Sequence, residues 1–224
     1  MGKVKGMKLV FASNNSHKLA EVRAMMPAGV EVLSLREIGF EQEIEENGTT
    51  LEANSRIKAE AVCDFISRQP LEMNQIDGVF ADDTGLEIDA LGGAPGVYTA
   101  RWYQQEPTLP LPEGKDMNET RIFAANRAKA LRELAGKADR GCRFRTVITL
   151  LKLSDVSRQM SEIQVEGVVR GRIAEEEYGE GGFGYDPIFI PEGYDKTFGE
   201  LPAEVKNQIS HRARAIEELV KVLY

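Results

Sequence analysis

In the first third of the chain, segments with a hydrophobic pattern typical of strands alternate with segments whose hydrophobic residues have helical spacing. The apolar run at 9–12 is typical of a buried strand, and residues 19–26 carry an apolar stripe at helical spacing. Another strand is expected at 30–35, after a proline and a glycine that end the helix. A strand, a helix and a second strand in this order predict an α/β fold.

The same alternation of strand and helix patterns continues through the middle of the chain. A helix is expected at 50–67 and a buried strand at 79–81, and we expect this strand to end at the turn 82–85. A half-exposed strand is expected at 86–89, before a glycine-rich loop at 92–96. Carboxylates at the end of a buried strand are typical of a functional site.

The second half of the chain predicts more helices around a sheet. We expect a helix at 118–135, an antiparallel pair of strands at 144–150 and 163–173, and a helical region that begins at Pro202 and restarts at Ser210. Internal repeats and low-complexity segments are absent from the sequence. The whole pattern predicts a mixed α/β sheet flanked by helices.

Composition and charge narrow the classes of function. The 224 residues, 42% of them hydrophobic, suffice for one elaborate domain, which we place at 7–224; residues 1–6 are expected to be a tag remnant or an alternative start. A net charge of −8 is unfavourable for binding the phosphate backbone of a nucleic acid, so nucleic acid is not expected as a partner. A triphosphate remains compatible, because a magnesium ion and a few lysines neutralise it locally.

Cysteine usage and hydropathy predict a cytoplasmic protein. Cys63 and Cys142 form neither a C-x-x-C pair nor a disulfide framework, as expected in a reducing compartment. Apolar stretches all fall short of the roughly 20 residues of a membrane span, and residues 1–7 lack the apolar core of a signal peptide. We therefore expect no membrane partner.

A strand-to-helix turn is the first candidate site. It consists of Ser13, Asn14, Asn15, Ser16, His17 and Lys18. Backbone N–H groups and the helix dipole favour an anion at such a turn, and Lys18 supplies a counter-charge. The glycines of a Walker A loop are missing. An ordinary helix cap followed by a solvated lysine explains the same residues.

Two acidic pairs are candidates for a metal site. Asp82 and Asp83 follow the expected buried strand, and Mg²⁺ is usually held by one or two carboxylates together with substrate phosphates. Asp83 is thus a candidate metal ligand or proton acceptor. Glu45 and Glu46 offer a second acidic group. An Asx turn and a pair of solvated glutamates are the competing interpretations.

A glycine-rich loop at 181–187 is a candidate for binding a nucleobase. Its glycines let the backbone approach a ligand closely, Phe183 offers a stacking surface, and Asp186 offers a hydrogen-bond acceptor. A turn that contains a core aromatic residue is the alternative.

Basic residues near the C-terminus offer a way to select a purine. Lys206, His211 and Arg212 lie here. If His211 and Arg212 face a 6-oxopurine, they present donors to its O6, whereas adenine presents an amino donor at that position. A buried donor that faces another donor costs about 1–3 kcal/mol. This difference gives a physical basis for rejecting ATP.

Taken together, these segments resemble the inosine triphosphate pyrophosphatase family, also described as XTP/dITP diphosphatases. The resemblance covers the chain from Met7 onward and rests on motifs that occur in family order. The motifs are Ser13-x-Asn15-x-x-Lys18, Glu45-Glu46, Asn54-x-x-x-Lys58-Ala59, Ala81-Asp82-Asp83-Thr84-Gly85-Leu86, Gly92-Gly93-Ala94-Pro95-Gly96-Val97, Gly182-Phe183-Gly184-Tyr185-Asp186-Pro187-Ile188-Phe189 and Ser210-His211-Arg212. Each motif is weak alone, and the ordered set is specific.

The resemblance implies a magnesium-dependent enzyme that acts on deaminated purine nucleotides. Water would attack the α-phosphorus of ITP, dITP or XTP and release the monophosphate and pyrophosphate, which cleanses the nucleotide pool. It implies Glu45 and Asp83 as metal ligands, Glu46 and Asp82 as further candidates, and Asp83 as general base. Residues 13–18 and Lys58 would bind the triphosphate. The remaining nucleotide contacts would come from Thr84, Phe183, Gly184, Tyr185, Asp186, Lys206, His211 and Arg212.

The resemblance also implies a fold and an assembly. It implies two lobes around a long mixed sheet, an active site in the cleft between them, and a homodimer. We therefore expect Lys18, Asp83 and Arg212 to converge on one site. Two other functions are open: a pyrophosphatase for modified pyrimidine or ordinary nucleotides, and a nucleotide sensor without turnover.

The chain departs from the family pattern in two places. Ala53 stands where many relatives carry a second acidic residue, which leaves both Glu52 and Glu46 as candidates to complete the metal shell. The proline-rich segment at 108–114 is not part of the motif set, and we expect it to bear on dimer contacts.

Overall fold

The computed structural model describes residues 6–69, 76–106, 119–153 and 161–224. The expectations for residues 1–5 and for the segment 108–114 therefore lie outside the described residues. Among the described residues, no helix is both long enough and apolar enough to span a lipid bilayer.

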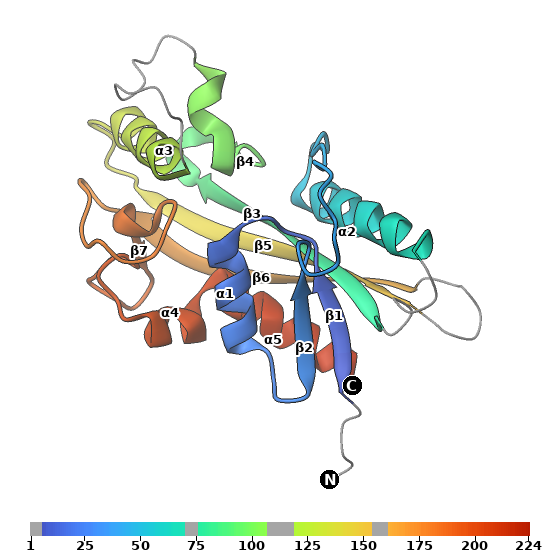
Figure 1. Ribbon diagram of the computed structural model, residues 1–224. Helices are drawn as coiled ribbons and strands as arrows, with labels where there is room; N and C mark the ends of the chain where they lie inside the picture. Colours follow the sequence, from blue (N-terminus) through green and yellow to red (C-terminus); the bar gives the residue numbers. More distant parts are fainter. Residues whose placement is uncertain (1–5, 70–75, 107–118, 154–160) are drawn as a thin grey trace. The chain divides into compact units, whose positions relative to one another are not determined.

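The strands form a mixed sheet, as the sequence predicts (Figure 1). Its order is β2 (Val30–Ser34), β1 (Met7–Phe11), β3 (Gly78–Ile88), β5 (Gly141–Lys152), β6 (Ser161–Ile173) and β7 (Phe189–Pro191), with β4 (Pro95–Gly96) paired to β3. Strand β1 runs parallel to β2 and β3, whereas the pairs β3–β4 and β6–β7 are antiparallel. The sheet is thus mixed.

Helices flank this sheet, and their boundaries follow the capping residues. They are α1 (Ser16–Met25), α2 (Leu51–Ser67), α3 (Glu119–Glu133), α4 (Ala203–Ile209) and α5 (His211–Leu223), with 3₁₀ segments η2 (Asp89–Leu91), η3 (Thr99–Gln105) and η4 (Asp186–Ile188). The N-caps of α1 and α2 are Asn15 and Thr50, whose side chains accept a backbone hydrogen bond from the first turn. Ser210 separates α4 from α5, so the expected restart is confirmed.

Strand β3 differs from the expectation. The sequence predicts a turn at 82–85 between two strands, but β3 is continuous from Gly78 to Ile88. The alternation expected at 86–89 is confirmed, because Leu86 and Ile88 are fully buried in a hydrophobic core whereas Glu87 is half-buried and Asp89 is exposed. Neighbouring strands satisfy the backbone here, so the polar Asp-Asp-Thr-Gly sequence does not break the strand.

The chain clusters into two compact units. The first unit comprises Met1–Asp83, Thr146–Gly167 and Arg212–Tyr224, and the second comprises Thr84–Arg145 and Val168–His211. The boundary falls within β3, β5 and β6, so each of these strands contributes residues to both units.

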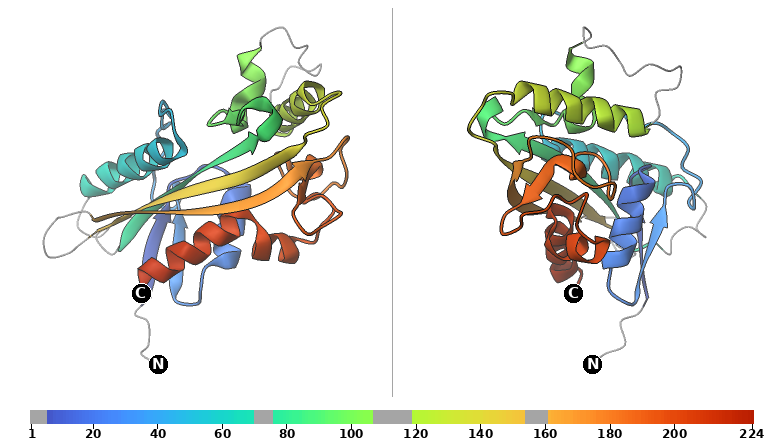
Figure 2. Two further views of the ribbon diagram at one scale, coloured as in Figure 1. Left: turned by 180° about the vertical axis from the view of Figure 1, so that it is seen from behind. Right: turned by 90° about the vertical axis from the view of Figure 1, so that its left-hand side faces the viewer.

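In the first unit, helices cover both faces of the sheet. Helix α2 lies on one face, and α1 and α5 lie on the other (Figures 1 and 2). Alternate residues of each strand serve the two faces: Val10 and Val79 pack in the core under α2, whereas Phe11 and Phe80 pack in the core under α1 and α5. A strand buried on both faces reads as a continuous apolar run, as at 9–12 and 79–81.

The second unit has its own core. Trp102 from η3 and Ala130 from α3 pack with Phe144, Phe189 and other buried residues of the strands. Helix α3 lies beside η3 in this unit (Figure 2).

The stacked pair Phe11 and Phe80 gives a test of the first core. Both side chains are fully buried, and their ring centroids lie 5.0 Å apart. We expect Phe80→Ala to lower the free energy of unfolding by about 3–5 kcal/mol, measured by urea denaturation, because it leaves a cavity. Tyr224→Ala, at a side chain that is 65% exposed, is the control and should change it by less than about 0.5 kcal/mol. Equal effects in the two variants would contradict the assigned core.

Candidate active site

The turn between β1 and α1 is built by a helix cap. Asn15 Oδ1 accepts a hydrogen bond from Lys18 N at 2.9 Å, and Asn15 N donates to Ser13 Oγ at 3.3 Å. The side chains of Asn14, Ser16 and His17 are exposed. The turn thus places the N-terminus of a ten-residue helix beside polar side chains, as an anion site requires.

The carboxylates of Asp82 and Asp83 lie just beyond the end of β1. The last residue pair between β1 and β3 joins Phe11 to Phe80. Successive side chains of a strand point to opposite faces, so Asp82 shares the face of Phe80, and Asp83 the face of Ala81. One carboxylate therefore lies on the α1 and α5 side and the other on the α2 side.

Asp82 joins two cations that are distant in the sequence. Its Oδ1 accepts from Lys18 Nζ at 2.9 Å, and its Oδ2 accepts from Nε and Nη2 of Arg212 at 3.2 Å. Arg212 also donates through Nη1 to Glu21 on α1. Asp82 is 1% exposed and Arg212 2% exposed. The cluster therefore ties α1, β3 and α5 together through buried ion pairs.

Burial and opposite charge compete at these groups. Burial by itself would raise the pKa of Asp82, but Lys18 and then Arg212 outweigh it and hold the pKa of this carboxyl well below its usual range. For Lys18 burial prevails and lowers the pKa of the ammonium, although Asp82 acts in the opposite direction. Asp82 is therefore ionised at neutral pH and pairs with Lys18.

Asp83 belongs to a second cluster, around Lys58 of α2. Lys58 Nζ lies 2.8 Å from Glu46 Oε2 and 3.6 Å from Asp83 Oδ1, and it is buried. Burial raises the pKa of Asp83, and Glu46 and Asp82 add to this effect, whereas Lys58 opposes it. Burial would lower the pKa of Lys58, but Asp83 and Glu46 reverse this and raise it. A carboxyl with a raised pKa is a stronger base in its ionised form.

Two carboxylates that share one ammonium form an arrangement suited to a divalent cation. Glu46 and Asp83 supply oxygen ligands, the type that Mg²⁺ prefers, and a magnesium site with two carboxylates takes its other ligands from water and phosphate. In the part of the chain that the structure describes, no group of three or more His, Cys, Asp or Glu residues is placed to hold a metal. Glu46 and Asp83 thus fit a magnesium site with two carboxylates.

Glu45 is the predicted metal ligand that lies outside this cluster. Its side chain is exposed, whereas that of the next residue, Glu46, is half-buried on Lys58. The two adjacent side chains thus differ in their surroundings. The structure therefore favours Glu46 over Glu45, and the role of Glu45 stays a prediction.

The glycine-rich loop of the second unit is held by an internal ion pair. Asp186 Oδ2 accepts from Phe183 N at 2.7 Å and from Lys206 Nζ at 2.6 Å. The same ammonium lies 4.7 Å from the centroid of the Phe183 ring, a cation–π contact. Arg127 of α3 donates to the carbonyl of Gly184 at 2.9 Å. Asp186 and Lys206 therefore orient the half-buried Phe183 ring.

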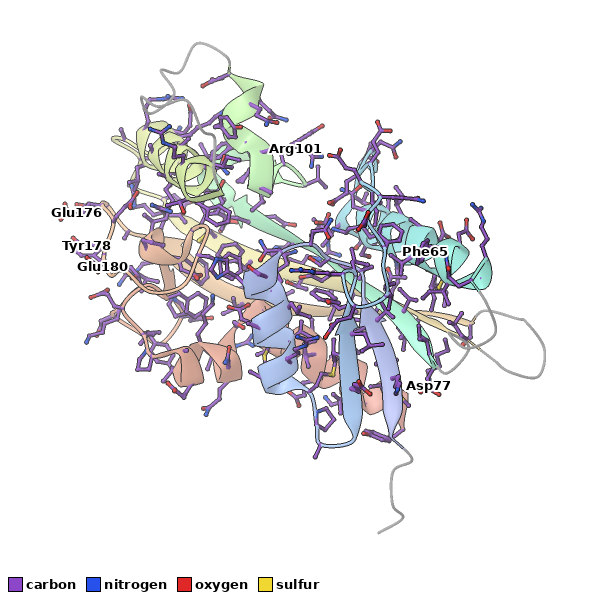
Figure 3. The ribbon with its side chains drawn as sticks, in the orientation of Figure 1. Phe65, Asp77, Arg101, Glu176, Tyr178 and Glu180 are labelled. Atoms are coloured by element: carbon purple, nitrogen blue, oxygen red, sulfur yellow. The ribbon has the colours of Figure 1, made fainter. Side chains whose placement is uncertain are left out.

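Close backbone contacts explain the glycines before this loop. A Cβ at Gly179 would lie 2.2 Å from the carbonyl carbon of Gly199, and the φ of Gly179 is +80°. The preceding segment is acidic, and Glu176, Tyr178 and Glu180 point outward from this unit (Figure 3). Tyr178 donates to Glu176 at 2.9 Å. The outer part of the loop is thus solvated while its glycines pack on backbone.

The other predicted residues of the second unit differ in burial. His211, at the start of α5, is buried and stacks on Phe144 with centroids 4.6 Å apart. Tyr185 lies in the core and donates from its hydroxyl to the carbonyl of Thr99 at 3.1 Å, and burial raises its pKa. Thr84 is half-buried. Tyr185 therefore acts as a core residue that anchors the loop.

Two residues of these clusters were not predicted from the sequence. Glu21 lies one helical turn after Lys18, and this spacing was its one available signal. Arg127 lies on a helix with no local sequence feature that connects it to the glycine-rich loop. Contacts with residues that are distant in the sequence bring both side chains into these clusters.

The buried anion at Asp82 gives a test by pH. Because its folded pKa is lowered, its contribution to stability is complete above the unfolded value, about 4, and is lost as the pH falls toward the folded value. We expect Asp82→Asn to lower the free energy of unfolding by about 3–5 kcal/mol at pH 7, since it removes the buried counter-charge that Lys18 and Arg212 share. The difference from the unmodified protein should shrink below about pH 4, measured by urea denaturation at several pH values. A difference that stays constant with pH would contradict this role.

Comparison with known proteins assigns the chain to a family. A model of the Ham1 family matches residues 9–222. The dITP/XTP pyrophosphatase of Flavobacterium johnsoniae is 40% identical over 97% of this chain and 98% of its own length, and that of Bacillus subtilis is 42% identical over 96% of each chain. The solved structure of the Ham1 protein of Staphylococcus aureus is 36% identical, with a TM-score of 0.74 over 96% of this chain and 97% of that one. These matches confirm the resemblance drawn from the motifs, and the chain belongs to the Ham1 family.

Proposed function

We propose that this protein is a magnesium-dependent pyrophosphatase that hydrolyses ITP, dITP and XTP to the monophosphate and pyrophosphate. The observation that carries the proposal is the gathering of Lys18, Lys58 and Arg212 around the adjacent carboxylates of Asp82 and Asp83. Such a gathering suits a polyphosphate and its metal ion. The names of the full-length relatives support the substrate class.

Asp83 and Glu46 are the residues that would hold magnesium. The ion, when bound, would neutralise phosphate charge and lower the pKa of a bound water. Lys58 neutralises both carboxylates. A triphosphate would offer Lys58 new anionic partners, which leaves the two carboxylates to the metal.

Asp83 is the proposed general base. Its ionised carboxylate would accept a proton from the attacking water, whose oxygen forms a bond to the α-phosphorus. The bond from that phosphorus to the bridging oxygen breaks, and pyrophosphate leaves. The raised pKa of Asp83 favours this proton transfer.

The turn 13–18 would bind the triphosphate. Helix α1 directs its N-terminus at this turn, and Asp82 fixes the position of Lys18. Both features are present before any ligand arrives, so binding would cost little ordering of these groups.

Selection of the base would fall to His211 and the loop around Phe183. Phe183 offers a ring face, and a donor on His211 suits O6 of a 6-oxopurine. Arg212, predicted as a second base reader, uses Nε, Nη1 and Nη2 for Asp82 and Glu21. We therefore assign Arg212 first to holding Asp82.

The resemblance adds a homodimer and a cytoplasmic location. Both are part of the proposal, and size-exclusion chromatography tests the dimer directly.

Identification of the products tests the reaction. With ITP and Mg²⁺ we expect equimolar IMP and pyrophosphate, measured by ³¹P NMR, and faster turnover of ITP, dITP and XTP than of ATP, UTP or dTTP. Stepwise release of orthophosphate would contradict the mechanism. Preference for pyrimidine or ordinary nucleotides would contradict the substrate class, and binding without products would indicate a sensor.

Asp83→Asn tests the general base. The amide keeps the shape of the side chain but cannot accept the proton at neutral pH, so we expect turnover to fall by about 10²–10⁴-fold with unchanged circular dichroism. Asp64→Asn, at an exposed carboxylate of α2, is the matched control. Retained activity in Asp83→Asn would remove this residue from its role.

Two adjacent glutamates allow a matched test of the metal site. We expect Glu46→Gln to raise the Mg²⁺ concentration for half-maximal activity more than Glu45→Gln does, because Glu46 lies with Asp83 on Lys58. The reverse order would reinstate Glu45 as the ligand that the resemblance implies.

A further inference from the structure

The position of Glu46 depends on a short segment that runs beside α2. Two contacts join this segment to the helix. Glu46 Oε2 meets Lys58 Nζ at 2.8 Å, and Gly48 N donates to Asn54 Oδ1 at 2.8 Å. Asn54 and Lys58 are four residues apart, so they lie on the same face of α2, one turn from each other.

The two contacts match in spacing. Four residues of helix rise about 6 Å, a length that two residues of chain can reach. The segment 46–48 therefore meets both helix positions at once, and it runs antiparallel to α2. A contact at each end fixes both its distance from the helix and its register.

Packing shows that the approach at Gly48 is close. A Cβ on Gly48 would lie 2.5 Å from Asn54 Oδ1 and 2.9 Å from Ala53 Cβ. A side chain at this position would push the segment away from the helix. The lack of space explains the glycine at this position. Its φ does not fall in the left-handed region, so the backbone conformation gives no separate reason for a glycine.

The buried side chain of Asn54 is unfavourable for the stability of the fold. It is fully buried, and its Nδ2 has no hydrogen-bond partner among the residues that the structure describes. A buried donor left unsatisfied costs about 1–3 kcal/mol. Stability alone therefore does not explain this asparagine, whereas its acceptor Oδ1 holds Gly48.

We propose that Asn54 is a positioning residue that fixes Glu46 as a metal ligand. The bond from Gly48 to Asn54 holds the segment 46–48 on α2, so that the carboxylate of Glu46 stays beside Asp83 and Lys58. Without this bond the segment gains conformational freedom, and Glu46 no longer stays beside Asp83. The inference rests on the proposed function, in which Glu46 and Asp83 bind the metal.

Binding of Mn²⁺ alone, measured by electron paramagnetic resonance without nucleotide, tests the proposal. We expect Asn54→Ala to weaken Mn²⁺ binding by about 10–100-fold, the usual cost of losing a group that orients a metal ligand. Ser55→Ala is the matched control. Ser55 is equally buried on the same helix, but its hydroxyl meets Thr149 at 2.6 Å. It should change the affinity by less than about twofold, although it also removes a buried hydrogen bond.

Gly48→Ala tests the contact between Gly48 and Asn54 from its other side. The added methyl displaces the segment from Asn54, so we expect a similar loss of Mn²⁺ affinity, and the double variant should be no weaker than the weaker single one. Amide exchange at Gly48, followed by NMR, should speed up in Asn54→Ala and stay unchanged in Ser55→Ala. If Asn54→Ala does not fold, the affinity of Gly48→Ala decides the question.

The possible failures are distinguishable. If the unmodified protein binds no Mn²⁺, or if Glu46→Gln binds as tightly as it does, the metal site of the proposed function is wrong. If Glu46→Gln weakens binding but Asn54→Ala and Gly48→Ala do not, the metal site stands and the role of Asn54 is overturned.

Discussion

The burial of the Asp82 carboxylate is the constraint on which the first unit depends. An ionised carboxylate that is 1% exposed is stable only with counter-charges, and Lys18 and Arg212 supply them from α1 and α5. Because each partner comes from a different element, the ion pairs set the position of both helices against β3. The same pairs present Lys18 at the turn where a phosphate would bind.

Asp82 and Asp83 are adjacent in β3 and point to opposite faces of the sheet, so their surroundings differ. Asp82 lies on the face of α1 and α5 and is saturated by cations, so its low pKa leaves it with little basicity. Asp83 lies on the face of α2, where burial raises its pKa and one lysine is shared with Glu46. Identical side chains thus differ in charge pairing and basicity because of their surroundings alone, which is the basis of the different roles that we propose for them.

Two segments, one in each unit, are held by contacts with polar side chains. Asn54 holds the segment of Glu46 through Gly48, and Asp186 with Lys206 holds the ring of Phe183. Each device combines a buried polar side chain with a glycine that permits close approach. In both places a buried polar side chain fixes a neighbouring segment, as outer-shell groups do around a site.

The sequence by itself determined the α/β class, most element boundaries and the family motifs, because these depend on local periodicity, caps and residue order. It misjudged β3, where pairing with neighbouring strands overrides the turn propensity of Asp82 to Gly85. Tertiary structure alone decided which of Glu45 and Glu46 meets Lys58, and that Arg212 pairs with Asp82 and Glu21. Those pairings join residues up to 191 positions apart, and no local pattern encodes a contact between distant side chains.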